Sequence, residues 1–62
     1  MTNPANTFEC LYRLATHPTT PAPEAHTAAV QAYRLAKRAG INGPHRSRVY
    51  RLARQGGWSE AE

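Results

Sequence analysis

The sequence contains few residues that could stabilise a small fold through a disulfide or a metal site. Cys10 is the only cysteine, so no disulfide can form within the chain and no cysteine-based zinc site can be built. The three histidines (His17, His26 and His45) do not have the spacing of zinc ligands, so we expect no metal and no cofactor. A chain of 62 residues buries only about 60% of the surface that its unfolded form exposes. Its stability must therefore come from packing or from association with a partner.

Long apolar runs are also absent. No stretch approaches the roughly 20 apolar residues of a membrane-spanning helix, and no signal-peptide segment follows Met1, so we expect a cytoplasmic protein with no membrane contact. Large apolar side chains are few. The predicted core contains Phe8, Leu11, Leu35, Ile41, Val49, Leu52 and Trp58, with Tyr12 and Tyr33 partly buried.

Acidic residues are missing from one long window, residues 32–58, although this window holds all the basic residues except Arg13. The window carries +7 and the rest of the chain −3, for a net charge of +4. A surface that is merely soluble mixes both signs, whereas phosphate contacts need Arg and Lys on one face. The charge pattern therefore favours nucleic-acid binding.

Apolar spacing predicts one all-α domain over residues 1–62, with helices at about 7–16, 21–39 and 44–56. In the first helix, Phe8, Leu11, Tyr12 and Ala15 follow the i, i+3, i+4, i+7 pattern, and either Asn3 or Asn6 can cap it. Residues 17–23 contain three prolines and should form an extended connector. Thr20 is placed to cap the second helix.

The second helix is expected to bury a face made almost entirely of alanine, which lets another helix approach closely. This face comprises Ala25, Ala28, Ala29, Ala32, Leu35, Ala36 and Ala39. Val30 falls on the opposite, polar arc, where it is either exposed or in contact with a partner chain.

A short turn should join the second and third helices, which would then form a helix-turn-helix. Gly40 is placed as the left-handed residue that ends the second helix, Asn42 and Gly43 offer caps, and Pro44 fits the first turn of the third. One arc of the third helix holds His45, Val49, Leu52 and Ala53, and the other holds Ser47, Arg48, Arg51, Arg54 and Gln55. Gly56 and Gly57 should end it, with Trp58 folding back over the core.

Two stretches resemble known DNA-binding helices. Residues 35–42, LAKRAGIN, look like the first helix and turn of bacterial helix-turn-helix repressors. Val49-Tyr50-Arg51-Leu52, followed by Arg54, Gly56 and Trp58, resembles the recognition helix of the excisionase-type (MerR-like) helix-turn-helix family, although the turn before it is longer here. The resemblance covers residues 35–58 and implies a DNA-binding transcription regulator or recombination directionality factor of a phage or mobile element. That family continues into a β-hairpin wing, which we do not expect in a sequence ending at Glu62.

On this interpretation the basic residues divide into two sets. We expect Arg48, Arg51 and Arg54, with Ser47 and Gln55, to enter or border the major groove of duplex DNA, and Arg34, Lys37, Arg38 and Arg46 to hold phosphates. One recognition helix offers little surface, so we also expect a homodimer or cooperative assembly on DNA, with Val30 and Tyr33 as candidate pairing residues.

Other functions are open to the same residues. The four glutamates are dispersed and no Ser, Cys or His has a recognisable nucleophile and base arrangement, so we do not expect an enzyme. The main alternative is a small helical protein-binding module, such as a phage-type inhibitor or modulator of a host protein, whose basic face docks on an acidic partner. An RNA ligand, or a basic face that is only solvated, also remains open.

Overall fold

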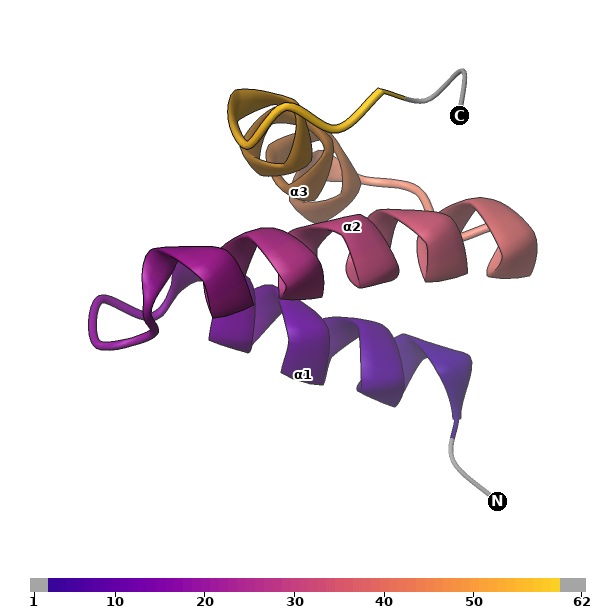
Figure 1. Ribbon diagram of the computed structural model, residues 1–62. Coiled ribbons are helices and arrows are strands. Elements are labelled where there is room, and N and C mark those ends of the chain that lie inside the picture. Colours follow the sequence, from indigo (N-terminus) through magenta and orange to yellow (C-terminus); the bar gives the residue numbers. More distant parts are fainter. Residues whose placement is uncertain (1–2, 60–62) are drawn as a thin grey trace.

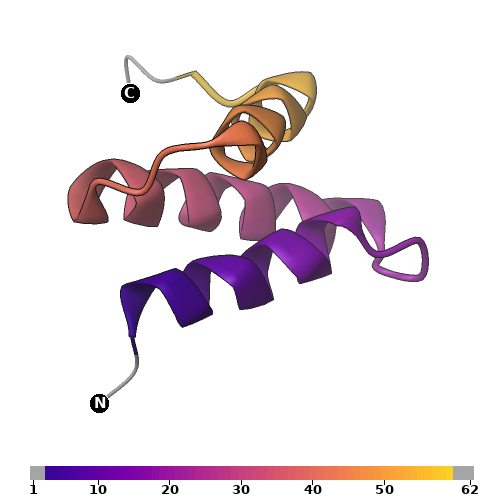
Figure 2. The same cartoon turned by 180° about the vertical axis from the view of Figure 1, so that it is seen from behind.

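The structure, a computed structural model, describes residues 3–59 and contains three α-helices: α1 (Pro4–Thr16), α2 (Ala22–Ala39) and α3 (Pro44–Gln55). No strand occurs within this range. Figures 1 and 2 show α1 running alongside α2, while α3 is seen nearly end-on and so crosses α2 at a steep angle. Both outer helices pack mainly on α2 and touch each other only slightly. The predicted all-α class of three helices is confirmed.

The ends of α1 and α2 follow local hydrogen bonding, with one prediction confirmed and one corrected. The Asn3 side chain caps α1 by accepting the N–H of Ala5 at 2.9 Å, so α1 begins earlier than residue 7. Thr20 does not cap α2. Pro21 is the N-cap residue, its carbonyl accepts from Ala25 N–H at 2.9 Å, and no side chain caps this end. Thr20 lies one residue too early for its hydroxyl to reach the free N–H groups of the first turn.

Two glycines shape the link between α2 and α3. Gly40 ends α2 in the left-handed conformation (φ 72°), and the N–H of Ile41 donates back to the carbonyl of Ala36 at 2.8 Å. Gly43, the N-cap of α3, has φ 132°, which L side chains rarely adopt. Gly40 acts as predicted, and the two glycines together turn the chain within four residues.

The core is built on the alanine face of α2. Its buried residues are Ala28, Ala29, Ala32, Tyr33 and Ala36, with Phe8 and Ala15 of α1 on one side and Val49 and Ala53 of α3 on the other. Because alanine has no side chain beyond Cβ, both outer helices can approach α2 closely. The predicted alanine face is thus largely confirmed, although Ala39 at the end of α2 is exposed.

Most of the larger apolar residues surround this alanine layer instead of filling it. Leu11, Leu35, Ile41, Leu52 and Trp58 were predicted in the core but are only partly buried against it. Val30 is also packed against the core and is not simply exposed. None of the described helices has the length and apolar character needed to cross a membrane.

An aromatic cluster fixes α3 on α2. The Tyr33 ring lies 4.8 Å from the ring of Tyr50 and 5.5 Å from that of Trp58, measured between centroids. Trp58 folds back after the end of α3, as predicted, and its backbone N–H donates to the carbonyl of Ala53 at 3.2 Å. Tyr33 is only 6% exposed, which removes it as a candidate for pairing with a second chain.

Candidate nucleic-acid interface

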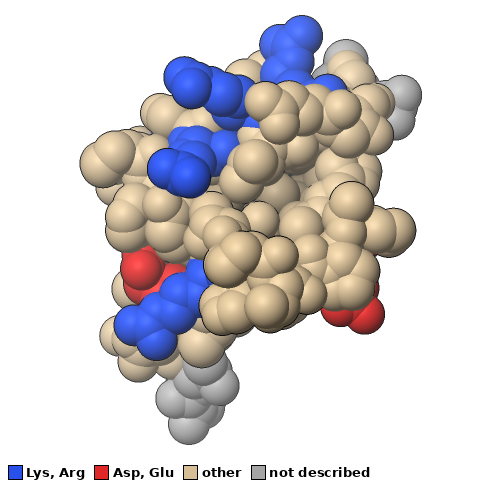
Figure 3. All heavy atoms as spheres, turned by 90° about the vertical axis from the view of Figure 1, so that its left-hand side faces the viewer, with Lys and Arg blue, Asp and Glu red and all other residues tan. Residues whose placement is uncertain are grey.

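The outer face of α3 carries the polar residues predicted for it. Val49 and Ala53 are fully buried and point toward α2, so the positions opposite them on the helix face outward. All five predicted groove residues are exposed: Ser47, Arg48, Arg51, Arg54 and Gln55. In Figure 3 most of the visible Lys and Arg side chains gather at the end of the molecule that α3 occupies. We call these five residues the α3 face.

Two shallow hollows lie on this face and share Ser47 and Arg51. One is lined by Ser47, Arg51, Arg54 and Gln55 together with Tyr50. The other is lined by Ser47, Arg48 and Arg51 and is completed by Tyr12, His45 and Pro44. Ser47 and Arg51 therefore lie at the centre of the α3 face, and the second hollow extends this face toward α1.

The three arginines of the α3 face differ in how they are held. Arg54 donates to the hydroxyl of Tyr50 at 3.1 Å, and its guanidinium carbon lies 5.7 Å from the centre of the Tyr50 ring. Arg48 and Arg51 make no hydrogen bond or ion pair with any residue in the range 3–59. No residue in this range therefore competes with a ligand for the guanidinium groups of Arg48 and Arg51.

The predicted phosphate-binding residues separate into two pairs. Lys37 Nζ and the guanidinium carbon of Arg46 lie 5.9 Å and 5.6 Å from the centre of the Tyr33 ring, so one cation from α2 and one from α3 converge there. Arg46 also donates to Asn42 Oδ1 at 2.6 Å. This pair lies where α2 meets α3.

Arg34 and Arg38 are exposed but lie elsewhere on α2. At 100° per residue they are displaced by about 160° and 200° from the fully buried Ala36. That position turns them away from both neighbouring helices. The structure therefore does not bring them to the α3 face.

Comparison with known proteins assigns no function to this surface. No family model, curated protein or solved structure matches the chain. Within the described residues, no group of three or more His, Cys or Glu side chains is placed to hold a metal ion. The function has to be inferred from the charges and geometry of the α3 face.

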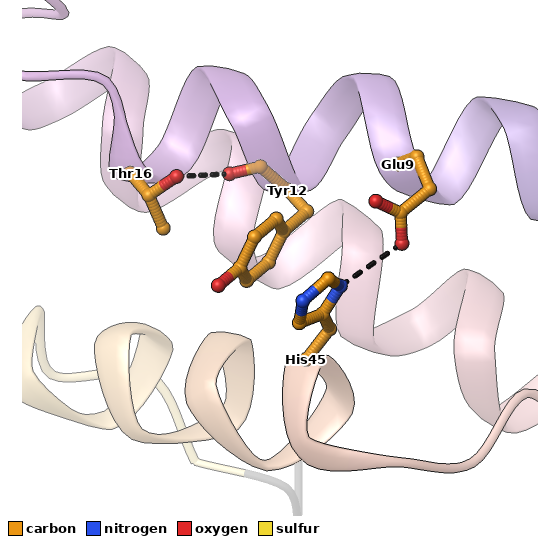
Figure 4. Close-up of polar contacts among 4 residues, drawn as sticks. All are labelled: Glu9, Tyr12, Thr16 and His45. Carbon is orange, nitrogen blue, oxygen red and sulfur yellow. Dashed lines mark hydrogen bonds and ion pairs between the residues drawn. The ribbon is translucent and has the colours of Figure 1, made fainter.

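Sequence reasoning missed the part of the surface that involves α1. His45 was predicted on the buried arc of α3, but its side chain is 47% exposed. It lies in the first turn of α3 and faces α1. Its ring stacks on that of Tyr12, with centroids 4.0 Å apart, and its Nδ1 lies 3.0 Å from Oε2 of Glu9 (Figure 4). No spacing along the sequence signals a contact between residues so far apart.

Proposed function

We propose that this protein binds duplex DNA through the α3 face, as a small cytoplasmic regulator or excisionase-like factor of a phage or mobile element. The observation that carries the proposal is a face with three exposed arginines, two of which have no partner among residues 3–59. DNA phosphates attract such a face, and a guanidinium fork matches the O6 and N7 atoms of guanine.

The arrangement of α2 and α3 supports this assignment. DNA-binding helix-turn-helix units join two steeply crossing helices by a short turn that often contains glycine, and the second helix enters the major groove. Here Gly40 and Gly43 bound the turn, and α3 crosses α2 steeply (Figure 1). The resemblance of residues 35–58 to excisionase-type proteins points to the same use of these helices.

Each cation near α3 has a role that fits its surroundings. We assign base contacts to Arg51, because it is exposed and lines both hollows of the α3 face, and we place Arg48 at the border of the groove, on the side toward α1. Arg54 is oriented by Tyr50 and loses less side-chain freedom on binding. Lys37 and Arg46 lie where α2 meets α3 and are assigned to phosphates beside the groove. Arg34 and Arg38 contribute long-range attraction rather than contacts.

The small size of the α3 face implies cooperation between chains. A single module of this kind covers only about 600–1,000 Å² of surface on DNA, which limits its affinity. We therefore propose a homodimer, or cooperative assembly of several copies on one duplex. With Tyr33 buried within the chain, the pairing surface must use other residues.

Replacing Arg51 and Lys37 separately by alanine tests the assigned roles. Selection from randomised duplexes would first supply a preferred sequence. Arg51→Ala should weaken binding to that sequence by about 1–3 kcal/mol and reduce the preference for it. Lys37→Ala should weaken binding to all sequences alike and reduce the slope of log affinity against log salt by about one.

Arg13→Ala is the matched control, because Arg13 is exposed on α1 and lines neither hollow of the α3 face. It should leave the sequence preference unchanged. The same loss for all three variants on every duplex would show that α3 does not read bases. No binding to any duplex would instead direct attention to an acidic protein partner.

A further inference from the structure

The hollow between α3 and α1 has the chemistry of a phosphate-binding site. It measures about 470 Å³ and is lined by Tyr12, Pro44, His45, Ser47, Arg48 and Arg51. Two arginines, a histidine and two hydroxyl groups therefore surround one space. Because Arg51 also lines the neighbouring hollow, this space is continuous with the α3 face.

His45 is held in a defined orientation at the edge of this hollow. Its ring stacks almost parallel on Tyr12, with an interplanar angle of 10°. Its Nδ1 lies 3.0 Å from Glu9, and an ionised carboxylate can only accept, so Nδ1 carries the hydrogen. Figure 4 shows the other ring nitrogen, Nε2, pointing away from Glu9. In the neutral ring Nε2 is therefore an acceptor, and it becomes a donor only when the ring takes up a second proton.

We propose that this hollow binds one phosphodiester group of the DNA backbone, with Arg48 supplying guanidinium donors and His45 donating through Nε2, while Arg51 at its edge remains directed to the bases. Since Nε2 must carry a proton to donate, binding is coupled to proton uptake at His45. The assignment rests on the proposed function, and it adds α1 to the interface through Tyr12 and Glu9.

The charge of the phosphate sets the direction of this coupling. The charged groups around His45 are Glu9 on α1 and Arg48 and Arg51 on α3. Tyr12 and Ser47 are neutral, and α2 contributes no residue to the hollow. An arriving phosphate adds a negative charge and so favours the protonated ring. Affinity should therefore be highest at low pH and fall as the pH rises.

Calorimetric titration of a short mixed-sequence duplex, in buffers of different ionisation enthalpy, measures the proton uptake directly. The wild-type protein should take up protons on binding and bind about threefold to tenfold more weakly at about pH 8 than at about pH 6. His45→Gln should abolish both the uptake and the pH dependence. His17→Gln is the matched control, since His17 is exposed in the connector before α2, and it should behave as wild type.

A second variant keeps the proposal testable if His45→Gln disturbs the fold. His45→Lys places a permanent positive charge at the hollow, so it should bind at about pH 8 as tightly as wild type does at about pH 6, without proton uptake. Unchanged proton uptake in both variants would overturn the assignment to His45 while leaving DNA binding intact. A wild-type protein that binds no duplex at either pH would contradict the proposed function itself.

Discussion

Phe8→Ala should remove a large part of the protein's free energy of unfolding. Phe8 is 2% exposed, and it and Val49 are the largest fully buried side chains in the structure. Removing a buried phenyl ring costs about 3–5 kcal/mol. A chain of this length has a total stability of only about 3–9 kcal/mol, so the loss is a large fraction of the whole. Thermal unfolding followed by circular dichroism should show a much lower melting temperature or no cooperative transition.

Leu14→Ala is the matched control on the same helix. Leu14 is 45% exposed, so its truncation should change the stability by about 0.5 kcal/mol or less. Similar melting temperatures for the two variants would show that the core is not organised around α1 and the alanine face of α2 as described.

Gly56→Ala should destabilise the protein by about 1–3 kcal/mol, because a Cβ at this position would overlap the imidazole ring of His26. The backbone of Gly56 has φ −84°, which any residue can adopt. The loss of stability would therefore come from the steric overlap and not from backbone strain. The ring of His26 would have to leave its place, where Nε2 lies 3.1 Å from the carbonyl of Ala53. That contact joins α2 to the last turn of α3. Chemical denaturation of the variant measures the loss.

A double-mutant cycle isolates this clash. In a His26→Ala background the ring is gone, so Gly56→Ala should cost almost nothing. The coupling energy should then be about as large as the effect of Gly56→Ala alone. Strictly additive effects would show that the His26 ring does not lie over Gly56.

The helices were predictable because their ends are set by local chemistry. Gly40 permits the left-handed end of α2, and Pro44 suits the first turn of α3, whatever the rest of the chain does. The degree of burial was less predictable, since it depends on how closely the helices approach. Leu52 and Trp58 have apolar side chains like Val49, yet of these three only Val49 is fully buried.

The candidate site was predictable only within α3. Helical periodicity places Arg51 opposite Val49 on any straight helix, so its exposure followed from the sequence. Periodicity cannot say on which side of α2 the next helix packs. For that reason the convergence of Lys37 and Arg46 on the Tyr33 ring, and the stacking of Tyr12 on His45, emerge only from the tertiary arrangement.

The most direct test of DNA binding is the salt dependence of wild-type affinity for a fluorescent duplex, measured by anisotropy at fixed pH. If the three cations assigned to phosphates (Lys37, Arg46 and Arg48) each neutralise one phosphate, log affinity should fall with log salt with a slope of about −3. Affinity would then drop roughly fortyfold between about 50 and 200 mM salt. Weak binding that does not change over this range would contradict the proposal that the α3 face binds DNA.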